Sequence, residues 1–178
     1  MKFRNSRTSY GLVAICFHWA SAVFAAALFS SGLWMTSLSY GSSWYHSAPE
    51  LHKSFGIMFA SLILGRLAWK GITTSPDEIG TRFEAMAAKT VHIALYLLLV
   101  ALFASGYLIA TGRGGGISVF GFLDVPSIFD IGRHTRTAGT IHLWAAYSIA
   151  ALTVLHAAAA LKHHFIDRDR VLVRMLGR

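Results

Sequence analysis

Acidic residues, and charged residues in general, are scarce in this chain of 178 residues. Asp and Glu number 8, Lys and Arg number 16, and charged residues make up 13% of the sequence, whereas soluble domains carry about 25%. Apolar residues reach 54%, and the mean hydropathy is +0.52. These proportions exclude a disordered chain, a coiled coil and a nucleic-acid-binding domain as first explanations of the positive charge. They predict a protein that lies in lipid.

Cysteine is nearly absent as well. The single cysteine, Cys16, permits no disulfide within the chain, and haem attached through a Cys-x-x-Cys-His motif is excluded. The glycine-rich segment 112–116 is not a phosphate-binding loop, because the Lys-Ser/Thr ending of that motif is missing. Any haem in this protein is therefore expected to be held without a covalent bond to cysteine.

Four apolar stretches are each long enough to cross the hydrocarbon core of a bilayer, which takes roughly 20 helical residues. They are residues 11–36, 52–70, 90–111 and 138–162, and all eight acidic residues lie outside them. We therefore expect an all-α, integral membrane four-helix bundle that forms one domain over residues 1–178.

The distribution of basic residues predicts the orientation in the membrane. The first apolar stretch is longer than the apolar core of a signal peptide, which has about 7–15 residues, so we expect it to remain as a span. With four spans, alternate connections lie on opposite sides, and 12 of the 16 Lys and Arg residues fall on the side of both termini. The positive-inside rule therefore predicts that both termini are cytoplasmic.

Four of the nine histidines fall into two pairs by their depth in the membrane. His142 and His156 lie in the fourth span, about 40° apart around the helix and about 21 Å apart along it. His52 opens the second span at the depth of His142, near the outer surface. His18 lies in the first span at the depth of His156, toward the inner surface. A buried imidazole in lipid is costly unless it is paired or functional, so each pair is predicted to share a ligand.

The two pairs suit haem better than other metal centres. Zinc or another divalent cation can bind imidazole, but a closed zinc site takes four protein ligands and each depth offers two. Di-iron bundles need inward carboxylates, and the predicted spans have none. Haem leaves only two axial positions to the protein, so we predict two b-type haems. Small residues near the histidines would let a flat macrocycle approach the backbone; they are Ala22, Gly56, Gly139 and Ala160.

The sequence resembles the bacterial di-haem cytochrome b-561 family of four-helix inner-membrane proteins over nearly its whole length. The residues that carry the resemblance are His18-Trp19, His52 with Gly56 and Arg66, His92 before Tyr96, His142, the run His156 to Leu161, His163-His164, and the tail from Asp169 through Leu172 to Arg174-Met175.

The resemblance implies a cofactor arrangement and an activity. His18 and His156 would hold the inner haem, and His52 and His142 the outer haem, which is the pairing reached from depth. A member of this family acts as a superoxide oxidase, which passes electrons from periplasmic superoxide through both haems to ubiquinone. The resemblance therefore implies an oxidoreductase of the bacterial inner membrane. The segment around residues 112–116 departs from the family, so the resemblance does not extend to the substrate entrance.

Three residues at the inner end are candidates for a quinone site. His163 is about 20° from the face of His156, and His92 stands near the cytoplasmic start of the third span. A histidine there can hydrogen-bond a quinone carbonyl or hand it a proton, and Arg66 is a further candidate. The alternative is an interfacial histidine that lipid headgroups solvate.

Basic residues on the outer side are candidates for contact with anions. Lys53 follows His52 directly and is the best candidate to neutralise the haem propionates. Arg133 and Arg136 are candidates, together with Lys53, to steer anionic superoxide toward the outer haem. The alternative for each of them is ordinary solubility of an outer loop.

Two functions from other classes fit the same sequence. As a membrane cytochrome b subunit, the chain would relay electrons between a dehydrogenase or hydrogenase partner and quinone, and a redox partner would copurify. As a transporter, its histidines would form a proton or metal-ion pathway, and the purified protein would be colourless.

The segment 112–137 is long for a connection in a bundle. Its apolar part, Ile117 to Phe122, is expected to lie against the bilayer or to cap the outer haem.

Overall fold

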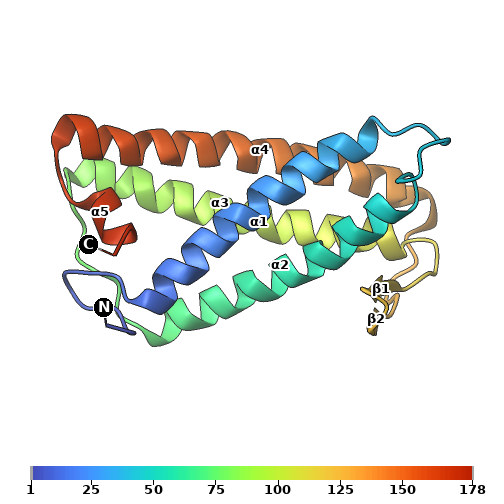
Figure 1. The fold of residues 1–178 in the computed structure, drawn as a ribbon, viewed down its shortest axis with the longest axis horizontal. Helices are drawn as coiled ribbons and strands as arrows, with labels where there is room; N and C mark the ends of the chain where they lie inside the picture. The colour runs from blue at the N-terminus through green and yellow to red at the C-terminus, as the bar shows by residue number, and fades with distance from the viewer. Residues whose placement is uncertain (1, 178) are drawn as a thin grey trace. The chain divides into compact units, whose positions relative to one another are not determined.

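The computed structural model describes residues 2–177 and consists mainly of four long helices (Figure 1). Each of these helices is long and apolar enough to cross a membrane. The predicted all-α, four-span architecture is confirmed, and one short β-hairpin is added to it. The elements are, in chain order, α1 (Leu12–Thr36), α2 (Ser47–Ile72), α3 (Arg82–Thr111), β1 (Ile117–Val119), β2 (Leu123–Val125), η1 (Gly132–His134), α4 (Thr135–Lys162), η2 (His163–Asp167) and α5 (Val171–Met175).

The chain divides into two compact units. The terminal unit comprises Met1–Ala22, Leu62–Tyr96 and Ala151–Arg178, and the hairpin unit comprises Val23–Ser61 and Leu97–Ala150. Each unit contains a segment of all four long helices. Each is therefore a small helical bundle that can be described by itself.

α3 begins at Arg82, well before the predicted start of the third span at residue 90. Thr81 and Glu84 form a capping box at this end. The Thr81 amide donates to Glu84 Oε2 at 2.9 Å, and the Glu84 amide donates to Thr81 Oγ1 at 3.3 Å. The Thr-x-x-Glu spacing ahead of an apolar run is the signal that the sequence analysis overlooked.

α2 also begins earlier than predicted, at Ser47 rather than at residue 52. Pro49 lies in its first turn, where the N–H that proline lacks has no partner within the helix. Glu50 and Glu84 consequently lie inside helices. Both lie in the first turn of their helix, outside the predicted apolar spans, because each helix begins before its apolar core.

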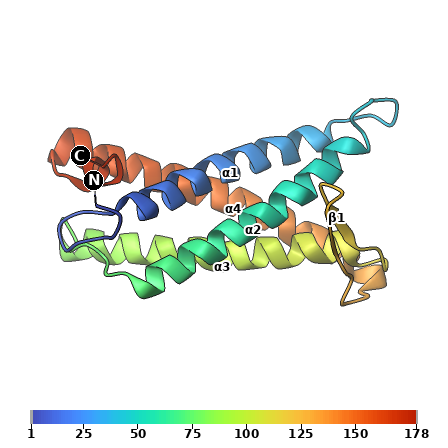
Figure 2. The same cartoon turned by 60° about the horizontal axis from the view of Figure 1, so that its bottom comes forward.

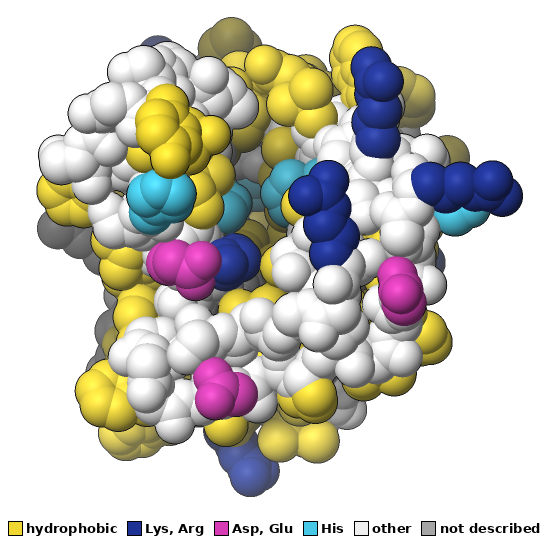
Figure 3. All heavy atoms as spheres, turned by 90° about the vertical axis from the view of Figure 1, so that its right-hand side faces the viewer, with side chains coloured by type: hydrophobic (Ala, Val, Ile, Leu, Met, Phe, Trp, Pro, Cys, Tyr) yellow, Lys and Arg dark blue, Asp and Glu magenta, His cyan; other side chains and the backbone are white. Residues whose placement is uncertain are grey.

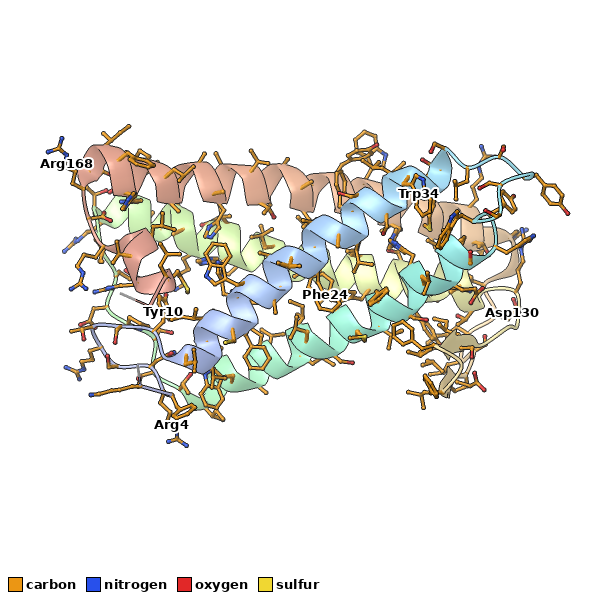
Figure 4. All side chains as sticks on the ribbon, in the orientation of Figure 1. Arg4, Tyr10, Phe24, Trp34, Asp130 and Arg168 are labelled. Atoms are coloured by element: carbon orange, nitrogen blue, oxygen red, sulfur yellow. The ribbon has the colours of Figure 1, made fainter. Side chains whose placement is uncertain are left out.

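Phenylalanines form much of the packing inside the hairpin unit. The ring of Phe24, labelled in Figure 4, lies parallel to that of Phe59 with centroids 5.8 Å apart. Phe59 also meets the edge of Phe103 at 5.4 Å and is 3% exposed. These contacts join α1, α2 and α3, and α2 carries His52.

The connection between α3 and α4 contains an antiparallel hairpin, in which Ile117 pairs with Val125. Positive φ angles at Phe120 (51°) and Gly121 (75°) make a type I′ turn. The Phe120 amide donates to Ser54 Oγ at 3.1 Å, and Ile117 is 2% exposed. The hairpin therefore packs on the start of α2 (Figure 2). The apolar segment Ile117 to Phe122, predicted to lie against the bilayer or to cap the outer haem, forms most of this hairpin.

Hydrogen bonds tie both chain ends together in the terminal unit, where the two ends lie near α5 (Figure 1). The Trp19 indole donates to the Met175 carbonyl at 2.9 Å. The Asp77 amide donates to the Arg7 carbonyl at 2.8 Å, and Arg174 donates to the Asp77 carbonyl at 2.7 Å. The α2–α3 connection is thereby joined to both terminal segments.

Candidate functional site

His52 on α2 and His142 on α4 approach each other in the hairpin unit. Their ring centroids are 6.5 Å apart, and the ring planes meet at 74°. An imidazole nitrogen binds a metal ion at about 2 Å, so two rings that hold one ion from opposite sides have centroids about 6 Å apart. The observed spacing therefore fits two axial ligands of one haem iron.

The Nδ1 atoms of both rings have hydrogen-bond partners on neighbouring helices. Ser31 Oγ lies 3.1 Å from His52 Nδ1, and the Leu102 carbonyl oxygen lies 3.0 Å from His142 Nδ1. Ser105 Oγ lies 3.4 Å from His142 Nδ1. A carbonyl only accepts, so His142 carries its proton on Nδ1 and keeps a free lone pair on Nε2. Metal-bound histidines typically engage their second nitrogen in this way, so the donor set fits a haem.

Two glycines make room for these rings. A Cβ added at Gly106 would lie 3.0 Å from Cε1 of His142, and one added at Gly32 would lie 3.4 Å from Cε1 of His52. Each glycine directly follows the serine that lies within hydrogen-bond distance of the same ring. The sequence analysis missed both serine-glycine pairs. Their signal was a polar residue followed by glycine inside an otherwise apolar span.

The four small residues predicted to lie beside the haems are divided between the two units. A Cβ added at Gly56 or at Gly139 would meet nothing within 4 Å. Both glycines therefore face open space, which is compatible with a flat ligand beside them. Ala22 and Ala160, the other two small residues, belong to the terminal unit.

Three histidines converge in the terminal unit. The ring centroids of His18 and His156 are 6.2 Å apart, close to the spacing of His52 and His142. His92, on α3, has its ring centroid 5.2 Å from that of His156. The spacing of His18 and His156 also fits one metal ion between two rings, and His92 lies beside this pair.

Arg66 lies near these histidines, and its charge also acts on Tyr10. Arg66 Nη2 is 3.2 Å from His18 Nδ1. Burial raises the pKa of the Tyr10 phenol, while the positive charges of Arg174 and Arg66 oppose that rise. The guanidinium of Arg66 is thus a positive charge within a partly buried histidine cluster.

His163 belongs to a different cluster of the terminal unit. Its Nδ1 is 2.6 Å from Asp169 Oδ2 and 3.2 Å from Asp167 Oδ2. Lys162 Nζ pairs with Glu84 Oε1 at 2.7 Å and with Asp167 Oδ2 at 2.8 Å. Donor atoms of Glu84, His163 and Asp167 lie within 4.8 Å of one another. Because Lys162 already pairs with both carboxylates, we describe the cluster as a salt-bridge network and assign it no metal.

The three predicted quinone residues are thereby divided into two groups. Arg66 and His92 lie with the pair formed by His18 and His156. Within residues 2–177, no hydrogen bond or ring contact joins His163 to Arg66 or His92. His163 instead lies beside carboxylates, where it has ready proton-exchange partners.

The three predicted anion-contacting residues also differ in their surroundings. Lys53 Nζ forms a 2.7 Å ion pair with Glu50 Oε1, so its charge is already matched. Arg133 in η1 and Arg136 in the first turn of α4 are exposed. Basic and acidic side chains are mixed on the face that carries the hairpin, and histidines are visible toward its middle (Figure 3).

Comparisons with known proteins agree with these features. The family model described as "Prokaryotic cytochrome b561" matches residues 9–178. "Cytochrome b561 homolog 2" of Escherichia coli (strain K12) is 46% identical over 181 residues, which cover 100% of this chain and 96% of the relative. "Cytochrome b561 homolog 1" of the same organism is 30% identical and covers 92% and 94% of the two chains.

A more distant relative has a functional name. "Probable superoxide oxidase CybB" of Yersinia pestis is 30% identical over 132 residues, which cover 71% of this chain and 73% of the relative. The chain therefore belongs to the prokaryotic cytochrome b561 family, as a bacterial membrane protein that carries b-type haem and transfers electrons.

Proposed function

We propose that this cytochrome carries two haems b, one near each membrane surface. His52 and His142 hold the outer haem, and His18 and His156 hold the inner haem. The observation that carries the proposal is the presence of one cross-helix histidine pair in each unit, with ring centroids 6.5 Å and 6.2 Å apart. When bound, the haems supply one-electron carriers between a donor and an acceptor.

The electron donor we propose is superoxide in the periplasm, and the acceptor is ubiquinone. The name of the Yersinia pestis relative supports this donor. Each superoxide loses one electron and leaves as O₂. Two such electrons and two cytoplasmic protons convert one ubiquinone to ubiquinol. This direction requires both termini to be cytoplasmic, which the 12 of 16 basic residues predicted on that side support.

His163 is the residue we propose to contact the quinone. Asp169 Oδ2 lies 2.6 Å from its Nδ1 and accepts a hydrogen bond from it, and Nε2 can donate to a quinone carbonyl when the ring carries a proton on both nitrogens. The side chain is 13% exposed, beside a carboxylate network that is more exposed. Protons can therefore reach the imidazole from water through groups that exchange them. Arg66 and His92 are the other residues proposed for the inner end.

The pairwise loss of haem tests the cofactor arrangement. His52→Ala and His142→Ala should each remove the outer haem, and His18→Ala and His156→Ala the inner haem, because each ring has its partner on a neighbouring helix. Pyridine haemochrome analysis gives haem per chain, and reduced spectra identify the missing haem. Perturbation of one and the same haem by His18→Ala and His52→Ala would contradict the pairing.

Rapid mixing with superoxide and ubiquinone tests the reaction. Superoxide should reduce the haems, and ubiquinone should reoxidise them. His163→Phe should slow reoxidation by quinone while both haems stay bound, whereas His164→Phe serves as a matched control at the next position. Haems that superoxide does not reduce would leave the membrane cytochrome subunit as the alternative, and a redox partner should then copurify.

A further inference from the structure

Arg66 is a partly buried cation on an apolar helix and has no acidic partner among the residues that the structure describes. Its one side-chain hydrogen bond joins Nη2 to His18 Nδ1 at 3.2 Å. In the part of the chain that the structure describes, residues 2–177, no carboxylate lies within ion-pairing distance of the guanidinium. A buried charge is costly unless it is paired. The position of Arg66 therefore favours an anion that the polypeptide itself does not supply.

The contact with His18 has a consequence for metal binding. A guanidinium only donates hydrogen bonds, so His18 Nδ1 must accept this one. A neutral histidine that accepts at Nδ1 carries its proton on Nε2 and has no lone pair there. His18 consequently cannot bind iron through Nε2 while Arg66 donates to its Nδ1. His142 differs, because its Nδ1 faces the Leu102 carbonyl.

We propose that Arg66 pairs with a propionate carboxylate of the inner haem rather than with His18. The guanidinium fork matches a carboxylate with two parallel hydrogen bonds. His18 would then carry its proton on Nδ1 and have the lone pair of Nε2 available for the iron. The inference rests on the proposal that His18 and His156 hold this haem, and it assigns Arg66 to the haem rather than to the quinone.

A second donor on the same turn of α2 supports the assignment. Trp69 follows Arg66 by three residues, so the two side chains leave neighbouring faces of the helix. The Nε1–H of Trp69 is buried and has no hydrogen-bond partner among the described residues. This turn of α2 therefore holds a cation without an anion and an N–H without an acceptor. Carboxylate oxygens satisfy both kinds of group.

Loading the protein with two forms of haem tests the proposal. The full chain with His52→Ala retains only the inner pair, and His142→Ala provides the same background if the first variant folds poorly. The apoprotein is titrated with haem b and with haem b dimethyl ester, whose propionates carry no charge. With Arg66 present, we expect the free acid to bind about tenfold to a hundredfold more tightly than the ester.

Variants on α2 assign this preference to one residue. Arg66→Met should abolish the preference for the free acid, and Arg66→Lys should keep part of it, because lysine retains the charge but lacks the fork. Lys70→Met removes a positive charge one turn further along α2 and should keep the full preference. Lys70 lies over the ring of Tyr96, 5.4 Å from its centroid.

Equal binding of the acid and the ester would overturn the inference, as would a preference that survives in Arg66→Met. The comparison of the two haem forms needs no substitution of Arg66, so a misfolded Arg66→Met protein cannot obscure it. A different result would show that His18 and His156 do not hold the inner haem. The single-pair protein would then keep its haem after His18→Ala.

Discussion

In the hairpin unit, each histidine ring is positioned by a serine hydroxyl and by the glycine that follows it on a facing helix. The glycines leave space for the rings, because a Cβ at Gly106 would lie 3.0 Å from His142 and one at Gly32 would lie 3.4 Å from His52. The serine hydroxyls lie within hydrogen-bond distance of Nδ1 of the same rings. Position and tautomer of the proposed haem ligands thus depend on residues that carry no charge.

Gly106→Ala should weaken haem binding in the hairpin unit. The added methyl would press on the His142 ring and force a shift that costs about 1–3 kcal/mol, as overpacking typically does. We expect a loss of haem per chain by pyridine haemochrome analysis, with the second haem retained. Gly71→Ala is the matched control, because Gly71 lies near the end of α2, outside the hairpin unit, and its methyl group would meet nothing within 4 Å. Unchanged haem content in Gly106→Ala would contradict this role.

Ser31→Ala should weaken haem binding more than Ser105→Ala does. His52 Nδ1 has Ser31 as its hydrogen-bond partner, whereas His142 Nδ1 keeps the Leu102 carbonyl at 3.0 Å without Ser105. Loss of such a supporting hydrogen bond lowers metal affinity about 10–100-fold. Haem titration of the two apoprotein variants gives the comparison. Equal losses in both variants would show that the hydroxyls do not act through Nδ1.

At the scale of elements, the hairpin is attached to α2 next to the candidate ligand His52. Ser54 is 2% exposed. Its Oγ accepts from the Phe120 amide at 3.1 Å and lies 2.9 Å from the Glu50 carbonyl, to which it donates. Phe55 and Phe120 add an edge-to-face contact at 5.0 Å. The buried hydroxyl of Ser54, two residues from His52, therefore links the hairpin of the α3–α4 connection to α2.

Ser54→Ala should loosen the hairpin while leaving the helices intact. The Phe120 amide would lose its partner in a buried position, which costs about 1–3 kcal/mol. Hydrogen-exchange mass spectrometry should show faster exchange over residues 117–125. Ser61→Ala serves as the control, because the Ser61 hydroxyl donates only to its own helix at the Ile57 carbonyl. Equal exchange over the hairpin in both variants would mean that Ser54 does not hold it.

At the scale of the whole molecule, the net charge of +8 is divided unequally. By the sequence-based orientation, 12 of the 16 basic residues belong to the side of the termini. The other side has four basic residues against Glu50, Asp124 and Asp130. Its field is therefore only slightly positive, and one of the three acids, Glu50, pairs directly with Lys53.

Neutralising Arg133 and Arg136 together should modestly lower the rate of haem reduction by superoxide. Exposed charges attract an anion through a field that salt screens beyond about 8 Å at physiological ionic strength. The double variant to Gln should therefore also flatten the decrease of this rate with added salt. Stopped-flow measurements with superoxide and with an uncharged donor separate steering from chemistry.

The matched control replaces Arg168 and Arg170, which lie in the terminal unit. This pair of substitutions removes the same charge and should leave the salt dependence as it was. A full salt slope in the Arg133 and Arg136 variant would rule out steering by these two residues. The proposed electron transfer would remain possible, and the donor would reach the haem without steering by these two arginines.

Much of the architecture could be predicted because lipid imposes simple constraints on a chain. Every span must be apolar over about 20 residues and must satisfy its backbone hydrogen bonds as a helix. Helical geometry then sets the depth of each histidine, so His142 and His156 could be placed near opposite surfaces. The structure brings His52 close to His142 and His18 close to His156, so the members of each predicted pair lie together.

The sequence by itself therefore determined the four helices that are long and apolar enough to span a membrane, and the family, and it predicted the two histidine pairs. Tertiary structure alone decided which groups face each other across helices: Ser31 and His52, Arg66 and His18, and His163 and Asp169. The reason is that membrane helices are apolar on nearly every side, so periodicity does not reveal which side faces a neighbour. Helix rotation sets those contacts, and it is fixed only when the helices pack together.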